Sequence, residues 1–245
     1  MRNTEKKESH YLSDGNITMS NALIKASHSL TLQEKRIICA CIAKNDSRLG
    51  AKRDAHLSPV LKEMRFKITA QDYHALFGVD INNCYKVLKK SSKSLMTKHF
   101  SMKKEVKGKE RIVDYAWLGY AEYAEEEGFI EIGFSQYAYP HLNALTNLFT
   151  TYKLRNAQSF RSMYTWRIYE LLQSWKHTKS LNIHLDDLRL ALDIPKSYKW
   201  IHIKNRALDS SIKELKEKSG IILDYTTFKT GRKITSLKFT WDKTL

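Results

Sequence analysis

The chain has 245 residues, which is enough for two domains of ordinary size. Its 42 lysines and arginines outnumber 26 aspartates and glutamates, so the formal net charge is +16. Such an excess indicates a polyanionic partner and favours nucleic acid over a membrane surface. No apolar run approaches the roughly 18 residues of a transmembrane helix, and no signal-peptide core is present. The three cysteines form no Cys-x-x-Cys pair, which argues against a disulfide framework or a metal site and for a reducing cytoplasm.

The N-terminal part of the chain predicts a tail followed by a partly buried helix. Residues 1–16 are polar, and we expect them to be disordered. Thr31 and Glu34 have the spacing of a capping box, in which each side chain accepts a hydrogen bond from the other residue's backbone N–H. The buried face of the following helix is assigned to Ile37, Ile38, Cys41 and Ile42. Residues 45–59 are expected to form a polar loop.

A helix-turn-helix pattern follows. Thr69 is positioned to cap a short helix that ends before Gly78, and Asp80 to cap a longer one over residues 81–98. Ile81, Cys84, Leu88 and Leu95 would face the core of that longer helix. Its predicted exposed face carries the candidate DNA-contacting residues Asn82, Asn83, Lys86, Lys89, Lys90 and Lys93.

Strand-forming segments come next. Residues 100–106 and 112–119 flank a basic turn at residues 107–111, which predicts a hairpin. A third strand, residues 129–134, follows the acidic run 125–127, which we interpret as a solvated hairpin tip and not as a metal site. After a short helix over residues 137–145 and a junction at 146–156, Ser159 is expected to cap a helix over residues 160–175. Arg161 and Arg167 would be free on that helix, and Arg161 is a further candidate for DNA contact.

The C-terminal stretch, residues 197–241, predicts one helix and one hairpin. Apolar residues at three-and-four spacing, from Trp200 to Leu215, form one helix face. Residues 221–228 and 234–241 flank the basic turn 229–233. A cationic helix face fits the major groove, and a basic hairpin beside it fits the neighbouring phosphates. The candidate residues are Lys199, His202, Lys204, Asn205, Arg206, Lys229, Arg232 and Lys233.

The two helix-turn-helix units are an internal duplication. Residues 68–79 align with residues 183–194, sharing the first isoleucine, an aspartate and a break before the next helix. Each copy is followed by a basic helix and a basic-tipped hairpin. We therefore predict an α+β fold of two tandem winged-helix domains, residues 17–145 and 146–245. The second domain is expected to be the principal reader of DNA.

Three motifs resemble the iteron-binding plasmid replication initiator (Rep) family. They are residues 21–27 with 30–37, residues 149–152 with 164–172, and residues 229–235 ahead of Phe239. This resemblance implies an initiator that binds direct repeats at an origin and attracts host replication proteins such as the replicative helicase. It also implies a monomer in equilibrium with a homodimer, which represses its own promoter through an inverted repeat. The family's recognition helix often carries a run of arginines, and here only Arg206 matches, which leaves the site sequence open.

Enzyme hypotheses find no support in the motifs. A rolling-circle nickase needs a His-hydrophobic-His metal pair, which neither His184 nor His202 provides. The sequence has no Gly-x-x-x-x-Gly-Lys-Ser/Thr loop for a nucleotide. We therefore expect a non-enzymatic DNA-binding protein without cofactor or metal. One alternative is a plain winged-helix transcriptional repressor, which would bind only an operator. The other is an RNA-binding module, which the sequence disfavours because it shows no exposed aromatic-bearing strands on which splayed bases could stack.

Overall fold

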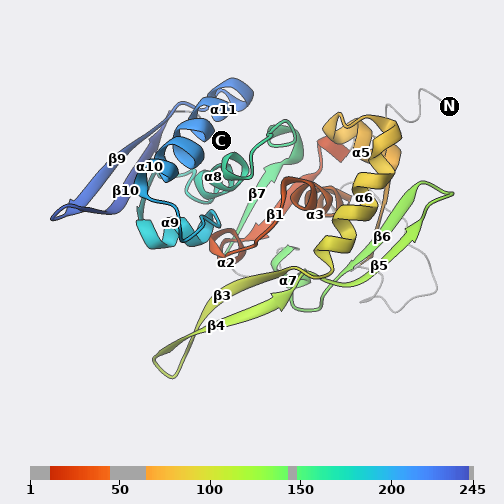
Figure 1. Ribbon diagram of the computed structural model, residues 1–245, viewed down its shortest axis with the longest axis horizontal. Helices are drawn as coiled ribbons and strands as arrows, with labels where there is room; N and C mark the ends of the chain where they lie inside the picture. Colours follow the sequence, from red (N-terminus) through yellow and green to blue (C-terminus); the bar gives the residue numbers. More distant parts are fainter. Residues whose placement is uncertain (1–11, 45–64, 143–147, 243–245) are drawn as a thin grey trace.

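The computed structural model describes residues 12–44, 65–142 and 148–242, and it contains two winged-helix units side by side (Figure 1). The first unit uses the helices α3, α5 and α6 with a three-stranded antiparallel sheet of order β2-β6-β5. Its elements are α3 (Leu32–Lys44), β2 (Arg65–Thr69), α5 (Ala70–Phe77), α6 (Ile81–Leu95), β5 (Leu118–Ala124) and β6 (Phe129–Phe134).

The second unit repeats this order of elements and this strand arrangement. Its sheet has the order β8-β10-β9, again antiparallel. Gly78 and Asp193, which the sequence alignment pairs, both have left-handed backbone conformations (φ 64° and 52°). The predicted duplication is therefore confirmed. The elements are α8 (Met163–Ser174), β8 (Ser180–His184), α9 (Leu185–Ala191), α10 (Trp200–His202), α11 (Ser210–Ser219), β9 (Leu223–Thr230) and β10 (Lys233–Trp241).

The predicted wing of the first unit is wrong. Strands β3 (His99–Val106) and β4 (Lys109–Ala116) pair with each other in a separate two-stranded sheet. The hairpin that completes the winged-helix sheet is β5–β6, because β6 is the strand that pairs with β2. The expected strand over residues 112–119 is split at Trp117, which is buried and lies between β4 and β5. The β3–β4 hairpin is thus an insertion between α6 and the wing.

Another small sheet joins the two predicted domains. Strand β1 (Asn16–Ser20) pairs antiparallel with β7 (Phe149–Lys153), so a strand from one side of the predicted 145/146 boundary completes a sheet with one from the other side. The short helices α2 (Asn21–Lys25) and α7 (Tyr139–Leu142) flank this sheet, and a 3₁₀ turn, Leu154–Asn156, follows β7.

The predicted disorder of residues 1–16 is wrong for residues 12–16, since Leu12 is buried and β1 begins at Asn16. Residues 1–11, the expected loop 45–59 and the end of the expected helix 137–145 lie outside the described residues.

Helix positions follow the sequence with local corrections. The capping box at α3 is present, since Thr31 N–H donates to Glu34 (2.7 Å) and Glu34 N–H to Thr31 (3.4 Å). Helix α6 ends at Leu95, not near residue 98, and Ile81 is 41% exposed, not in the core. Helix α8 begins at Met163 with Ser162 at its N-cap, so the cap predicted at Ser159 is wrong.

The core is one continuous cluster of buried apolar side chains that includes both units. Helix α3 is buried around its whole circumference, because elements of both units pack on it. This explains why Lys35, which is not among the residues assigned to the buried face, is also buried, in an ion pair with Glu170 of α8 (2.6 Å). Tyr152 of β7 donates a further hydrogen bond to Glu170 (2.7 Å).

Candidate nucleic-acid interface

The recognition helix of the second unit is continuous from α10 to α11 but contains a π-helical stretch, Ile203–Asp209. Its buried side comprises Ile203, Ala207, Leu208 and Leu215, as the apolar periodicity predicts. π-Helical stretches occur frequently at functional sites. The helix ends at Gly220, whose left-handed conformation (φ 68°) suits a residue without a side chain.

The predicted reading residues on this helix have different surroundings. Asn205 and Arg206 are exposed. The Arg206 guanidinium donates to the Tyr198 hydroxyl (3.2 Å) and lies over the Tyr198 ring, with its Cζ atom 5.4 Å from the ring centroid. Lys204 instead pairs with Asp209 on the same helix (2.6 Å), and this hydrogen bond raises the pKa of Lys204. Arg206 is therefore held in one orientation, while the Lys204 side chain is paired with Asp209 further along its own helix.

Tyr198 is a functional candidate that our sequence reasoning missed. Besides Arg206, it contacts the ring of His202 edge-on, with ring centroids 5.5 Å apart. Its carbonyl accepts a hydrogen bond from Arg189 of α9 (2.6 Å), which ties the segment before the recognition helix to the preceding helix. The four-residue spacing of Tyr198, His202 and Arg206 is the signal that could have revealed this group.

The β9–β10 wing presents exposed cations next to this helix. Lys229, Arg232 and Lys233 are exposed at the hairpin tip. The turn is tighter than predicted, since β9 extends to Thr230 and β10 starts at Lys233. Trp200 of α10 packs edge-on against Tyr225 of β9 (centroids 6.5 Å apart), which fixes the wing beside the start of the helix. Helix and wing together form a cationic face that can follow a duplex.

The corresponding face of the first unit has a different charge pattern. On α6, Asn82, Asn83, Lys86, Lys90 and Lys93 are exposed as predicted. Lys89, however, pairs with Glu125 at the tip of the β5–β6 wing (2.6 Å). That tip carries the acidic run 125–127, so the wing of the first unit is anionic where that of the second is cationic.

Two other predicted arginines lie elsewhere. Arg161 is exposed ahead of α8, where its backbone N–H donates to Glu214 of α11 (2.7 Å). Arg167, expected to be free, is fully buried, because its side of α8 faces the junction with the first unit. It donates to the carbonyls of Ala26 (2.5 Å) and Ala191 (2.6 Å). Arg167 is thus a connection between the units and not a DNA contact.

His28 and Asp193 complete this connection. Arg167 lies 2.6 Å from Nδ1 of His28, and the Nε2 of His28 lies 2.7 Å from the carbonyl oxygen of Leu23. A neutral imidazole with its proton on Nε2 satisfies both contacts. Burial, with Arg167 and Lys35 nearby, holds the pKa of His28 well below its usual value. The Asp193 carboxylate accepts hydrogen bonds from the backbone N–H groups of His28 (3.1 Å) and Ser29 (3.0 Å).

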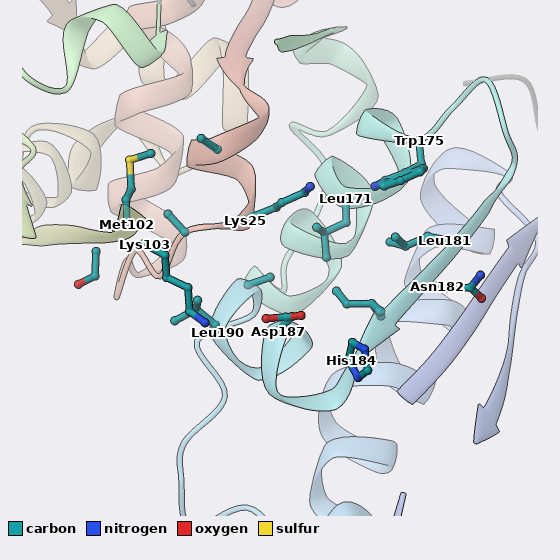
Figure 2. Close-up of a pocket in the computed structure, with 15 residues that line it drawn as sticks. Lys25, Met102, Lys103, Leu171, Trp175, Leu181, Asn182, His184, Asp187 and Leu190 are labelled. Carbon is teal, nitrogen blue, oxygen red and sulfur yellow. The ribbon is translucent and has the colours of Figure 1, made fainter. Parts of the chain in front are cut away.

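A cavity of about 390 Å³ lies beside this junction, with walls from α2 and β3 on one side and α8, β8 and α9 on the other (Figure 2). Its apolar lining includes Leu171, Leu181 and Leu190, and Lys103 and Asp187 add opposite charges. Because β3 lines the cavity, the base of the inserted hairpin lies against the second unit. The cavity therefore belongs to the junction between the units and not to the cationic face.

No group of three or more His, Cys, Asp or Glu residues placed to hold a metal ion occurs within the described ranges. Nor is any helix in that part of the chain long and apolar enough to cross a membrane. Cys39, Cys41 and Cys84 are buried free thiols, and burial raises the pKa of Cys39 to about 12. These thiols accordingly have little thiolate character at neutral pH.

Comparisons with known proteins give the family. The profile described as "Initiator Replication protein, WH1" matches residues 16–173, and "Initiator Rep protein, WH2" matches residues 184–241. The chain is 29% identical over 185 residues to a replication initiation protein of Escherichia coli, covering 73% of this chain and 54% of that protein. It is 26% identical over 243 residues to the PI protein of Escherichia coli, covering 86% of this chain and 77% of that protein.

Solved structures agree on the fold. The crystal structure of Pi initiator protein in complex with iteron DNA is similar with a TM-score of 0.69 and 24% identity, covering 94% of this chain and 97% of that one. Domains 2 and 3 of RctB are similar with a TM-score of 0.51 and 11% identity, covering 93% of this chain and 86% of that one. The two matched profiles span both winged-helix units, and the chain belongs to the family of initiator replication proteins with WH1 and WH2 domains.

Proposed function

We propose that the protein initiates plasmid replication by binding direct repeats in origin DNA as a sequence-specific duplex-binding protein. The observation that carries this is the face formed by the α10–α11 helix and the β9–β10 wing, with Asn205, Arg206 and the wing-tip cations exposed together. Membership of the initiator family and the similar fold of Pi initiator, solved with iteron DNA, support it. The reducing cytoplasm, where plasmid DNA resides, is the expected compartment.

Two recognition helices in one chain predict contact with two successive major grooves. Groove entries on one face of B-DNA are about 10 base pairs apart, so the footprint should be roughly 20 base pairs long. If about 6–10 phosphates are contacted, affinity should drop about 10³–10⁵-fold between 50 and 200 mM salt. Hydroxyl-radical footprinting of origin DNA tests this, and protection of a single half-turn would contradict the two-groove arrangement.

Oligomeric state is the proposed regulatory switch. A monomer with two reading units suffices for one direct repeat, whereas an inverted repeat requires a two-fold dimer. The inserted β3–β4 hairpin supports a role as interface, since in the described structure β4 pairs with β3 alone and Ile112 is 71% exposed. Edge pairing of β4 with its copy in a second chain would then form the dimer that represses the protein's own promoter.

Proline substitutions on β4 test that interface. Backbone N–H groups of neighbouring strand residues point to opposite sides, so Ile112→Pro and Val113→Pro remove donors on opposite edges of β4. One variant should weaken the hairpin, and the other should block pairing with a second chain. The latter should sediment as a monomer, lose binding to an inverted repeat and keep binding to a single direct repeat. Equal loss of both activities in both variants would move the interface elsewhere.

Strand opening is proposed to rest on binding energy and DNA deformation and not on hydrolysis. Host replication proteins such as the replicative helicase are the proposed next partners. A plain transcriptional repressor is the alternative function. The two functions are distinguished by asking whether a plasmid that carries only the origin replicates when this chain is supplied from a second plasmid. A repressor would silence its operator without supporting replication.

A further inference from the structure

An exposed isoleucine lies in the first turn of the recognition helix of the second unit. Ile201 is 52% exposed, and it precedes the fully buried Ile203 by two residues. It lies one helical turn before the exposed Asn205, so the two side chains occupy the same outer ridge. An apolar side chain thus lies among the polar residues proposed to read base edges.

The major groove offers such a side chain one apolar partner. Base edges there present hydrogen-bond donors, acceptors and the C5-methyl group of thymine. We infer that Ile201 is a specificity-determining residue that contacts a thymine C5-methyl group in the bound site. The inference rests on the proposed placement of this helix in the major groove.

The first unit has a comparable residue. Ile81, the first residue of α6, is 41% exposed beside the exposed Asn82 and Asn83. Each recognition helix therefore presents an exposed isoleucine together with side-chain amides in its first two turns. The second helix is the better test, because Arg206, held by Tyr198, lies on the turn after Ile201.

Removing the methyl group from the DNA isolates this contact. Deoxyuridine pairs as thymidine does but lacks the C5-methyl group. The full-length protein would first be used to select its preferred site from a random duplex library. Each thymidine of that duplex would then be replaced singly by deoxyuridine, and binding measured for the wild type, Ile201→Ala and Ile222→Ala. Ile222 is a matched control, since it is 54% exposed and lies after the recognition helix, before β9.

The expected result is a double-mutant cycle with coupling at one or two positions. There the wild type and Ile222→Ala should lose about fourfold in affinity on removal of the methyl group, the factor equivalent to about 0.8 kcal/mol for one buried carbon. Ile201→Ala should bind the thymidine duplex more weakly and be indifferent to deoxyuridine at those positions. Thermal unfolding of each variant confirms that the fold is intact.

Two results would overturn the inference. One is a wild type indifferent to every deoxyuridine substitution, and the other is a loss that persists undiminished in Ile201→Ala. In both cases, the earlier selection of a preferred site from the random library would show that the proposed sequence-specific DNA binding still holds. If no site is preferred over random duplex, the proposed function itself fails.

Discussion

The two winged-helix units share a scaffold and differ at the tips that would meet DNA. In the second unit the wing tip carries Arg232 and Lys233 beside a recognition helix with an oriented arginine. In the first, an acidic tip holds Lys89 of its own recognition helix through Glu125. The difference teaches that duplication of a fold does not duplicate its surface charge. We propose that charge at a few exposed positions makes the second unit the principal base reader, while the first unit enters its own groove with weaker contacts and carries an inserted hairpin.

The largest effect is expected where the two units are joined. Glu170→Gln leaves the buried Lys35 without its ion-pair partner, and breaking a buried pair in this way costs about 3–5 kcal/mol. Denaturant unfolding should show that loss in a single transition if the units unfold together. Lys89→Gln is the matched control, because it removes an ion pair at the surface, where solvent screening leaves little effect on the free energy of unfolding. Two separate transitions in the wild type would show that the units are independent.

The two recognition helices are expected to differ in base reading. Arg206→Ala should cost about 1–3 kcal/mol on the preferred site and relax preference at one base position. Lys90→Ala on α6 should weaken preferred and random duplexes alike, because phosphate contacts carry no sequence information. Competition binding against random duplex measures both. The assignment is overturned if Arg206→Ala weakens the two duplexes equally.

Acid should weaken the connection that the units share at His28. The folded state holds the pKa of His28 low, while the unfolded chain has an ordinary value of about 6.5. Below about pH 6.5 the unfolded chain binds a proton at His28 that the folded protein does not. The free energy of unfolding is therefore highest above about pH 6.5 and declines as the pH falls, by up to about 1.4 kcal/mol per pH unit. His141, whose pKa is also lowered by burial, adds in the same direction.

A variant identifies the His28 contribution. Unfolding free energies of the wild type and His28→Gln would be measured between pH 7 and 5. The variant should show a shallower decline, with the remaining slope set by other groups such as His141. An identical slope in both proteins would remove His28 as the cause.

The smallest effects are expected at the two wing tips, with opposite signs. Arg232→Ala should weaken preferred and random duplex equally, by a few-fold, and reduce the salt slope by about 1. Glu126→Gln should leave binding unchanged or strengthen it slightly, since it removes an anion from the tip of the first wing. Salt titrations of both variants give the comparison, and a loss of affinity in Glu126→Gln would give the acidic tip a positive role.

Local sequence signals predicted much of the scaffold. Thr69 and Asp72 form a capping box at α5, and Gly78 ends that helix in a left-handed conformation, as short-range chemistry requires. The buried side of the second recognition helix followed from periodicity alone. Partners across the fold were harder to foresee. The orientation of Arg206 depends on Tyr198, and the withdrawal of Lys204 depends on a π-helical stretch that no residue spacing announced.

By itself, the sequence determined the helix-turn-helix units, their duplication and a positive charge suited to DNA. These are properties of neighbouring residues, and spacing and capping specify them. Tertiary structure decided which hairpin is the wing, because only pairing with β2 distinguishes β5–β6 from β3–β4. It also placed Arg167 and Lys35 inside, since a helix packed on several sides buries residues that single-stripe periodicity assigns to solvent. Strand partners and burial depend on segments far apart in the chain, and no local pattern contains them.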